Sequence, residues 1–206
     1  MNKKKLTLII GATLILLVTI LMIIYTINKD DKKNKEAINK VEKIDEMDNY
    51  DYYLEENATK YYKELYNKLK DVLSKDEVNN EEYAKIIAQL FVTDLFTLDN
   101  KMTSNDIGGL QFIYPSFKDD FINIAKTTLY SIVESNIYGD RTQELPIVTN
   151  TKVSDIKSST FTYQEKEYNS YEVLVTIEYE KDLDYPKEYN LILINNDKYI
   201  QVVASE

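Results

Sequence analysis

The distribution of hydrophobic and charged positions divides the chain into three parts. The first part contains the run Leu6–Ile27, which is 22 residues long and carries no charge. At about 1.5 Å per residue, a helix of that length reaches roughly 33 Å, enough to cross the hydrocarbon core of a bilayer. No cleavage site with small residues follows the run, so residues 1–27 are expected to form a cytoplasmic stub and an uncleaved transmembrane signal anchor. A signal peptide that is removed is the alternative.

The lysines on the two sides of this run predict its orientation. Lys3, Lys4 and Lys5 precede it, and four more lysines follow it closely, so the two flanks are nearly balanced. Because the N-terminal stub is short and basic, we expect the N-terminus to lie in the cytoplasm and the domain after Ile27 to be extracellular. The chain is therefore predicted to be a single-pass protein of the cell membrane.

Residues 28–56 form the second part and predict a charged stalk. Their few apolar residues are spaced as on one narrow face of a helix. These residues are Ile38, Val41, Ile44 and Met47. A stripe this narrow is typical of a solvated helix or a flexible connection rather than of a packed element. We therefore expect a helical stalk between the anchor and the domain.

Three helices are predicted after residue 57, because apolar positions there recur every three or four residues. The first carries a single apolar face from Ala58 to Val72. The second, residues 81–98, is apolar around most of its circumference, as expected of a helix that is buried on most sides. The third begins with a cap formed by Ser116 and Asp119, and we expect it to end at Gly139.

After Pro146 the hydrophobic period changes from helical to two, which predicts four strands. The segments are KVSDIKSSTFTYQ, SYEVLVTIEYEKD, KEYNLILINN and KYIQVVASE. Short turns connect them, so the sheet should be antiparallel. Helices followed by such strands predict the α+β class, with three helices packed on a curved antiparallel sheet of about four strands. Residues 57–206 would form this extracytoplasmic domain.

The adjacent pair Gly108 and Gly109 is conspicuous because the chain has only four glycines. The surrounding residues, SNDIGG, favour turns and left-handed backbone. We interpret the pair as a structural turn with a close backbone approach, followed by a short strand over residues 110–114. A phosphate-binding loop is disfavoured because the segment lacks the Gly-x-x-x-x-Gly-Lys spacing and is flanked by Asp99 and Asp106 instead of a lysine. A calcium loop is disfavoured because Lys101 stands at a ligand position.

Composition narrows the range of functions. The chain has 35 acidic and 25 basic residues, for a net charge of −10; residues 1–27 carry +3, so the remainder carries −13. An acidic domain repels phosphate backbones, which argues against nucleic-acid binding. The chain contains no histidine and no cysteine, which excludes Ser–His and Cys–His catalysis and the usual zinc sites. We expect no metal, no cofactor and no enzymatic activity. Richness in Lys, Asn, Ile and Tyr suggests a bacterial source.

Asp94 is the most unusual residue of the predicted domain. On a helical wheel it lies in the apolar arc of the second helix, close to Leu90 and Leu98. A carboxylate at such a position must be hydrogen-bonded, paired with a cation or directed into a cavity. Asp94, Leu90 and Leu98 are therefore candidate pocket residues. The structural alternative is a buried acid that anchors a loop amide or a Lys or Arg side chain.

The order of the predicted elements resembles the cone-shaped fold of the nuclear transport factor 2 superfamily. The resemblance covers residues 57–206, where FVTDLFTLDNK and SNDIGGLQFIYP look like a family signature. Membrane-tethered members of that superfamily occur among scaffold components of bacterial type IV secretion and conjugation machines. The resemblance implies a concave pocket between helix and sheet, toward which Asp94 would point. It assigns no functional residue, because fold alone does not give function.

These observations lead to two hypotheses about function. The first is a membrane-anchored, non-enzymatic interaction or scaffold module of a bacterial envelope assembly, whose partners are other envelope proteins or a second copy of itself. The alternative is binding or hydrolysis of a small molecule or a cell-wall sugar. An apolar, closed pocket would favour the first hypothesis. An open pocket in which Asp94, a tyrosine and another acid converge would favour the second.

Overall fold

The computed structural model describes residues 41–205. The predicted anchor and the first part of the predicted stalk lie outside these residues. No helix within residues 41–205 is both long enough and apolar enough to cross a membrane. The described chain forms one compact unit that begins at Glu42.

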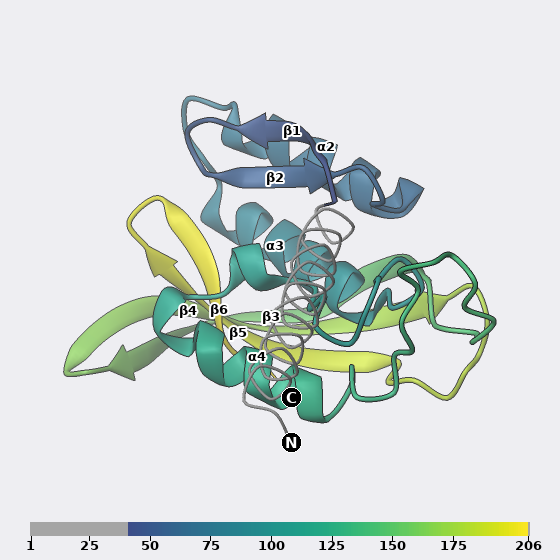
Figure 1. Ribbon diagram of the computed structural model, residues 1–206. Coiled ribbons are helices and arrows are strands. Elements are labelled where there is room, and N and C mark those ends of the chain that lie inside the picture. Colours follow the sequence, from purple (N-terminus) through teal and green to yellow (C-terminus); the bar gives the residue numbers. More distant parts are fainter. Residues whose placement is uncertain (1–40, 206) are drawn as a thin grey trace, which may run out of the picture. The chain divides into compact units, whose positions relative to one another are not determined.

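Two antiparallel sheets and three α-helices build this unit (Figure 1). The first sheet is a hairpin of β1 (Lys43–Met47) and β2 (Tyr52–Glu55). The helices are α2 (Lys60–Leu73), α3 (Asn80–Phe96) and α4 (Lys118–Thr127). The second sheet has the order β3-β4-β5-β6, with β3 (Val148–Tyr163), β4 (Lys166–Tyr179), β5 (Glu188–Asn196) and β6 (Tyr199–Ser205).

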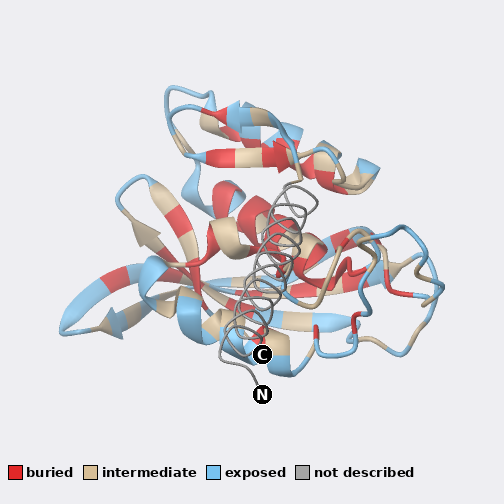
Figure 2. Ribbon diagram, viewed as in Figure 1, coloured by how far each residue is buried: buried red, intermediate tan, exposed pale blue. Residues whose placement is uncertain are grey.

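α3 forms the centre of the core. It contacts all four strands of the larger sheet on one side and α2 on another. Figure 2 shows that α3 is buried along most of its length. Its N-terminus is capped by Asn79, whose Oδ1 accepts a hydrogen bond from the Glu82 amide at 3.0 Å. The wide apolar arc of the sequence is therefore explained by burial on several sides.

The expected fold is wrong in its sheets: the structure has six strands in two antiparallel sheets, not one sheet of about four strands. The additional sheet replaces part of the helical stalk. In this hairpin Met47, Tyr52 and Leu54 are buried in the core, and the Tyr66 hydroxyl of α2 donates a hydrogen bond to the Tyr52 carbonyl at 3.1 Å. The charged segment before residue 57 is thus a packed element in its second half, because alternate residues of β2, Tyr52 and Leu54, are buried.

The third helix is also shorter than expected. It ends at Thr127 instead of near Gly139, and its N-cap is Phe117, which makes no side-chain cap bond, rather than Ser116. The Thr127 and Thr128 hydroxyls donate back to the carbonyls of Asn123 and Ile124. Such bonds compete with the helical ladder, and Thr128 has a non-helical ψ of −98°. The chain continues in turns from there.

The segment after the glycine pair is not a strand. Leu110–Phe112 form a 3₁₀ helix, η1, and Pro115–Phe117 form a second one, η2. Between them Ile113 makes a single parallel bridge to Val202 of β6. The segment therefore runs along the β6 edge of the sheet, where the Tyr114 amide donates to the Val202 carbonyl at 2.9 Å.

Candidate functional site

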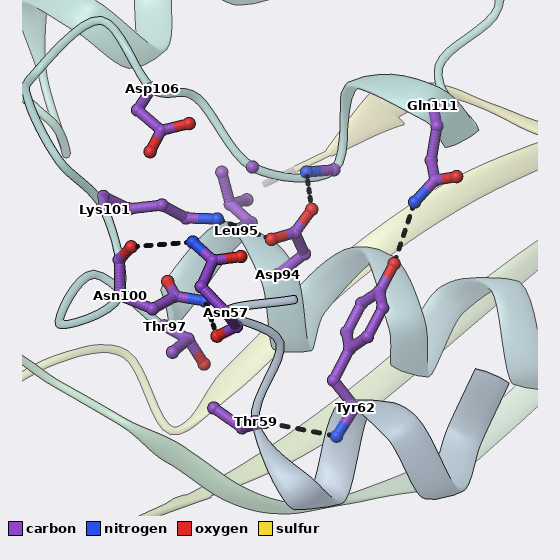
Figure 3. A network of polar contacts seen from close by, with 12 residues as sticks. Asn57, Thr59, Tyr62, Asp94, Leu95, Thr97, Asn100, Lys101, Asp106 and Gln111 are labelled. Atoms are coloured by element: carbon purple, nitrogen blue, oxygen red, sulfur yellow. Dashed lines mark hydrogen bonds and ion pairs between the residues drawn. The ribbon is translucent and has the colours of Figure 1, made fainter. Parts of the chain in front are cut away.

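A polar pocket of about 210 Å³ lies where α3 ends and the glycine loop begins. Four parts of the chain line it: β2 with the residues that follow it, the first turn of α2, the last turns of α3, and the loop from Asn100 to Gln111. The lining residues include Tyr53, Glu55, Asn57, Tyr62, Asp94, Asn100, Lys101, Asp106 and Gly108. Figure 3 shows how most of these side chains converge.

Asp94 forms one fixed point of this pocket. Its Oδ1 lies 2.6 Å from the Lys101 ammonium, and its Oδ2 accepts a hydrogen bond from the Gly109 amide at 2.6 Å (Figure 3). The side chain of Asp94 is 23% exposed, whereas that of Lys101 is only 4% exposed. Asp94 therefore has a lysine partner and a loop-amide partner, and it also lines the cavity.

The buried Lys101 ammonium depends on this arrangement. Burial alone would lower the pKa of Lys101, but the Asp94 and Asp106 carboxylates outweigh that effect, so its pKa lies above the usual value for lysine. Asp106 is held in turn by the Met102 amide, which donates to its Oδ2 at 3.1 Å. The positive charge of Lys101 is thus neutralised by carboxylates within the protein.

The glycine pair lets the loop approach α3 closely. A Cβ on Gly108 would lie 2.2 Å from the Asp94 carbonyl oxygen. Gly109 has φ of +78°, and a Cβ there would lie 2.8 Å from the Phe91 ring. The Gly108 amide donates to the Tyr130 hydroxyl at 2.9 Å, and that hydroxyl donates to the Leu95 carbonyl, also at 2.9 Å. Both glycines therefore allow the loop to pack closely against α3 and form this wall of the pocket.

The opposite wall is less completely bonded. Asn57 and Asn100 exchange bonds from their side-chain amides to each other's backbone carbonyl, at 3.0 and 3.2 Å. Their Oδ1 atoms are buried and accept no hydrogen bond within the described residues. The half-buried Glu55 carboxylate makes no hydrogen bond or ion pair with residues 41–205. Burial, followed by repulsion from Asp94, raises the pKa of Glu55 above its usual value.

The charge balance of the pocket is negative. Glu55, Asp94 and Asp106 supply three carboxylates, against the single ammonium of Lys101. The Tyr53 and Tyr62 hydroxyls add polar groups, and burial raises the pKa of both, so both remain protonated at neutral pH. Within residues 41–205, no three acidic side chains are placed to hold a metal ion. The pocket is suited to a hydrogen-bond donor that carries a positive charge.

The residues predicted from sequence are distributed unequally around the pocket. Asp94 and Gly108 line it, and Gly109 lies directly behind it, bonded to Asp94. Leu90 and Leu98 are fully buried in the hydrophobic core and do not line the pocket. Sequence reasoning missed Glu55, Asn57, Asn100 and Asp106. Lys101 could have been recognised, because a lysine seven residues after a buried acid on a helix can reach back to it.

Comparison of the chain with models of protein families, with curated proteins and with solved structures found no match. The resemblance to the nuclear transport factor 2 superfamily therefore gains no support from related proteins.

Proposed function

We propose that this protein is a binding module whose pocket receives a ligand bearing a primary ammonium group. The observation that carries the proposal is the Glu55 carboxylate, which has no bonded partner among residues 41–205 and lines a cavity already negative through Asp94 and Asp106. An ammonium would neutralise Glu55 and offer donors to the oxygens around it. The cavity is smaller than the roughly 300 Å³ at which most ligand pockets begin, which suits an amine-bearing chain end rather than a large ligand.

The shape of the site bears on the two hypotheses from the sequence. Asp94, two tyrosines and further acids converge on an open pocket, and this arrangement favours a pocket-based function over a scaffold alone. Both oxygens of Asp94 are engaged, which argues against Asp94 as a general base. The uncharged run Leu6–Ile27 supports attachment of the module to a membrane, with the pocket outside the cytoplasm.

Hydrolysis is a second candidate, favoured by the same Glu55. A carboxyl group whose pKa is raised by burial is suited to donate a proton as a general acid. This function would require the full-length chain to release nitrophenol from a chromogenic glycoside, and a Glu55→Gln variant to lose that activity.

The binding proposal is tested by comparing two ligands that differ in one charged group. Nα-acetyl-lysine amide carries the ammonium, and Nα-acetyl-norleucine amide is the neutral match. We expect the lysine derivative to raise the Tm of the full-length chain in nonionic detergent and the norleucine derivative to leave it unchanged, because binding to the native state alone stabilises it.

Two variants make this test specific. Glu55→Gln should abolish the rise in Tm, whereas Glu56→Gln should retain it, because Glu56 is exposed and does not line the pocket. Equal responses to the two ligands, or a response that survives Glu55→Gln, would contradict the proposal.

A further inference from the structure

The two edges of the larger sheet are protected to different extents. At one edge, β6 is covered by the segment around Ile113 and by η2 and α4. At the other edge, only the beginning of β3 is covered: the Thr151 amide donates to the Tyr61 hydroxyl at 2.8 Å, and Gln89 Nε2 donates to the Thr151 carbonyl at 2.8 Å. Beyond Val153, no group within residues 41–205 bonds to the outer edge of β3.

The register identifies the backbone groups that point outward along this edge. The Ile177 amide bonds to the Lys187 carbonyl on the β5 side, so its partner Thr151 directs its own amide and carbonyl away from β4. A bulge between Val153 and Asp155 shifts the alternation by one residue. The outward residues beyond it are Ile156, Ser158, Thr160 and Thr162. The two-residue turn Gln164–Glu165, with φ of 49° and 64°, is consistent with this alternation.

This part of the edge lacks the features that normally prevent pairing. Natural edge strands are blunted by charged residues, proline or bulges. The stretch Ser158–Gln164 contains no charge, no proline and no glycine, and its Thr, Phe and Tyr residues favour strands. The only bulge of the β3–β4 pair near this region lies before the stretch, at Val153. In Figure 1 the hairpin of β3 and β4 extends past the helices, and Ser158, Thr160 and Thr162 are exposed among the described residues.

We propose that a second copy of this chain pairs with this edge, β3 against β3 in antiparallel orientation about a two-fold axis. Pairing would join two four-stranded sheets into one continuous sheet. Charge permits this occupant: two chains of net charge −10 repel each other in general, but the strip Ser158–Gln164 is neutral, so pairing along it brings no like charges together. At its end Asp155 and Lys157 form an ion pair of 2.7 Å that adds no net charge. This surface is separate from the pocket, which contains no residue of β3.

The absence of cysteine from the chain allows a direct test. Single cysteines are placed in turn at positions 156–162 of the full-length chain in nonionic detergent, and disulfide formation is followed on non-reducing gels after mild oxidation. We expect strong cross-linking at one position close to the two-fold axis, with a decrease on either side. Thr149→Cys is the control, because Thr149 is an exposed residue near the covered end of the same strand. Cross-linking no stronger than that of the control at every position would overturn the proposal.

A backbone variant tests the same contact by a different measurement. Thr160→Pro removes one outward N–H. No bond to β4 is lost, because the Thr160 amide points away from β4, and proline is tolerated at such an edge position. The dimer, measured by light scattering during size exclusion, should weaken about tenfold, since each copy loses one backbone hydrogen bond. Thr160→Lys places like charges near the axis and should weaken the dimer in a way that added salt partly reverses. If neither variant changes the mass while both keep the parent's circular dichroism, the proposal is wrong.

Discussion

The two walls of the pocket differ in how completely their polar groups are satisfied. On the α3 side, both oxygens of Asp94 are bonded, the Lys101 ammonium is buried against it, and Gly108 is fixed by Tyr130. On the β2 side, Glu55 has no bonded partner in the described chain. The polar groups of the α3 wall are bonded to one another and hold the structure together. The β2 wall keeps a carboxylate that has no partner in the described chain and can bind a ligand.

This difference separates residues that look alike in the sequence. Asp94 and Glu55 are both partly buried carboxylates that line the same cavity. Removing Asp94 should cost stability, because it leaves a buried cation without its partner. Removing the charge of Glu55 should cost binding, but it should slightly raise stability at neutral pH. Substitutions on the two walls should therefore change stability in opposite directions.

The largest effect is expected at Gly108. In Gly108→Ala the new Cβ would lie 2.2 Å from the carbonyl oxygen and 2.6 Å from the carbonyl carbon of Asp94, both of which are backbone atoms. The loop must then move away from α3 and lose its bonds to Tyr130 and Asp94. We expect a loss of about 3 kcal/mol or more in the free energy of unfolding, measured by urea denaturation. Asn105→Ala, at an exposed position of the same loop, is the control and should change little. Similar stability of the two variants would show that the close approach is not required.

The second effect concerns Asp94. Asp94→Asn keeps an acceptor for the Gly109 amide but leaves the ammonium of Lys101, whose side chain is 4% exposed, without its counter-charge. We expect a loss of about 2–4 kcal/mol by the same measurement. The double variant Asp94→Asn with Lys101→Met should recover much of this loss, because it removes the unpaired charge. A double variant less stable than Asp94→Asn would indicate that Lys101 is not stabilised chiefly by Asp94.

The pH dependence of this pair follows from the raised pKa of Lys101. A lysine with a raised pKa in the folded state stabilises the protein fully below its unfolded pKa of about 10.4, and loses that contribution only as the pH rises through the folded value. In the parent, this contribution of Lys101 should therefore be nearly constant between about pH 6 and 9. In Asp94→Asn, burial without the main counter-charge lowers the pKa of Lys101, so the destabilisation should become smaller as the pH rises through that range. A destabilisation that grows with pH would contradict this.

The sequence predicted the parts of the fold that have a clear period. The first two helices and the four strands after Pro146 were located correctly, because their apolar positions follow helical spacing or alternation through α2, α3 and β3–β6. The hairpin β1–β2 was missed because Val41, Ile44 and Met47 also fit a helical stripe. Packing against distant segments distinguishes the two forms, as in the bonds of Tyr52 to Tyr66 and Tyr83, and such contacts leave no local pattern.

The same limit applies to the pocket. Asp94 was identified because a carboxylate contradicts the apolar arc around it. Glu55 lies in a segment rich in charged residues, so nothing in the local sequence distinguishes it. Asn57 and Asn100 are far apart in the sequence and come into contact only when the chain folds. Leu90 and Leu98 were expected beside Asp94 at the pocket, but Leu90 of α3 and Leu98, which follows the C-cap Thr97, are both fully buried in the core. A charged residue in an apolar stretch can be recognised as unusual from the sequence, whereas a polar residue in a polar stretch cannot.

The smallest effect on stability, and the one of opposite sign, is expected at Glu55. Its pKa is raised in the folded state by burial and by repulsion from Asp94, so the ionised form opposes folding. The stabilising protonated form is fully present below the unfolded pKa of about 4.3, and its contribution is lost as the pH rises through the folded value. The glutamine side chain of the variant Glu55→Gln does not titrate, so the variant should have a higher Tm than the parent at pH 7. The gain in the free energy of unfolding should be smaller than the losses expected for Gly108→Ala and Asp94→Asn. That advantage should vanish below about pH 4, where the parent is protonated as well. Thermal unfolding of both proteins across this range measures it. A lower Tm for Glu55→Gln at pH 7 would mean that Glu55 has a stabilising partner inside the protein, and the contrast between the two walls would be lost.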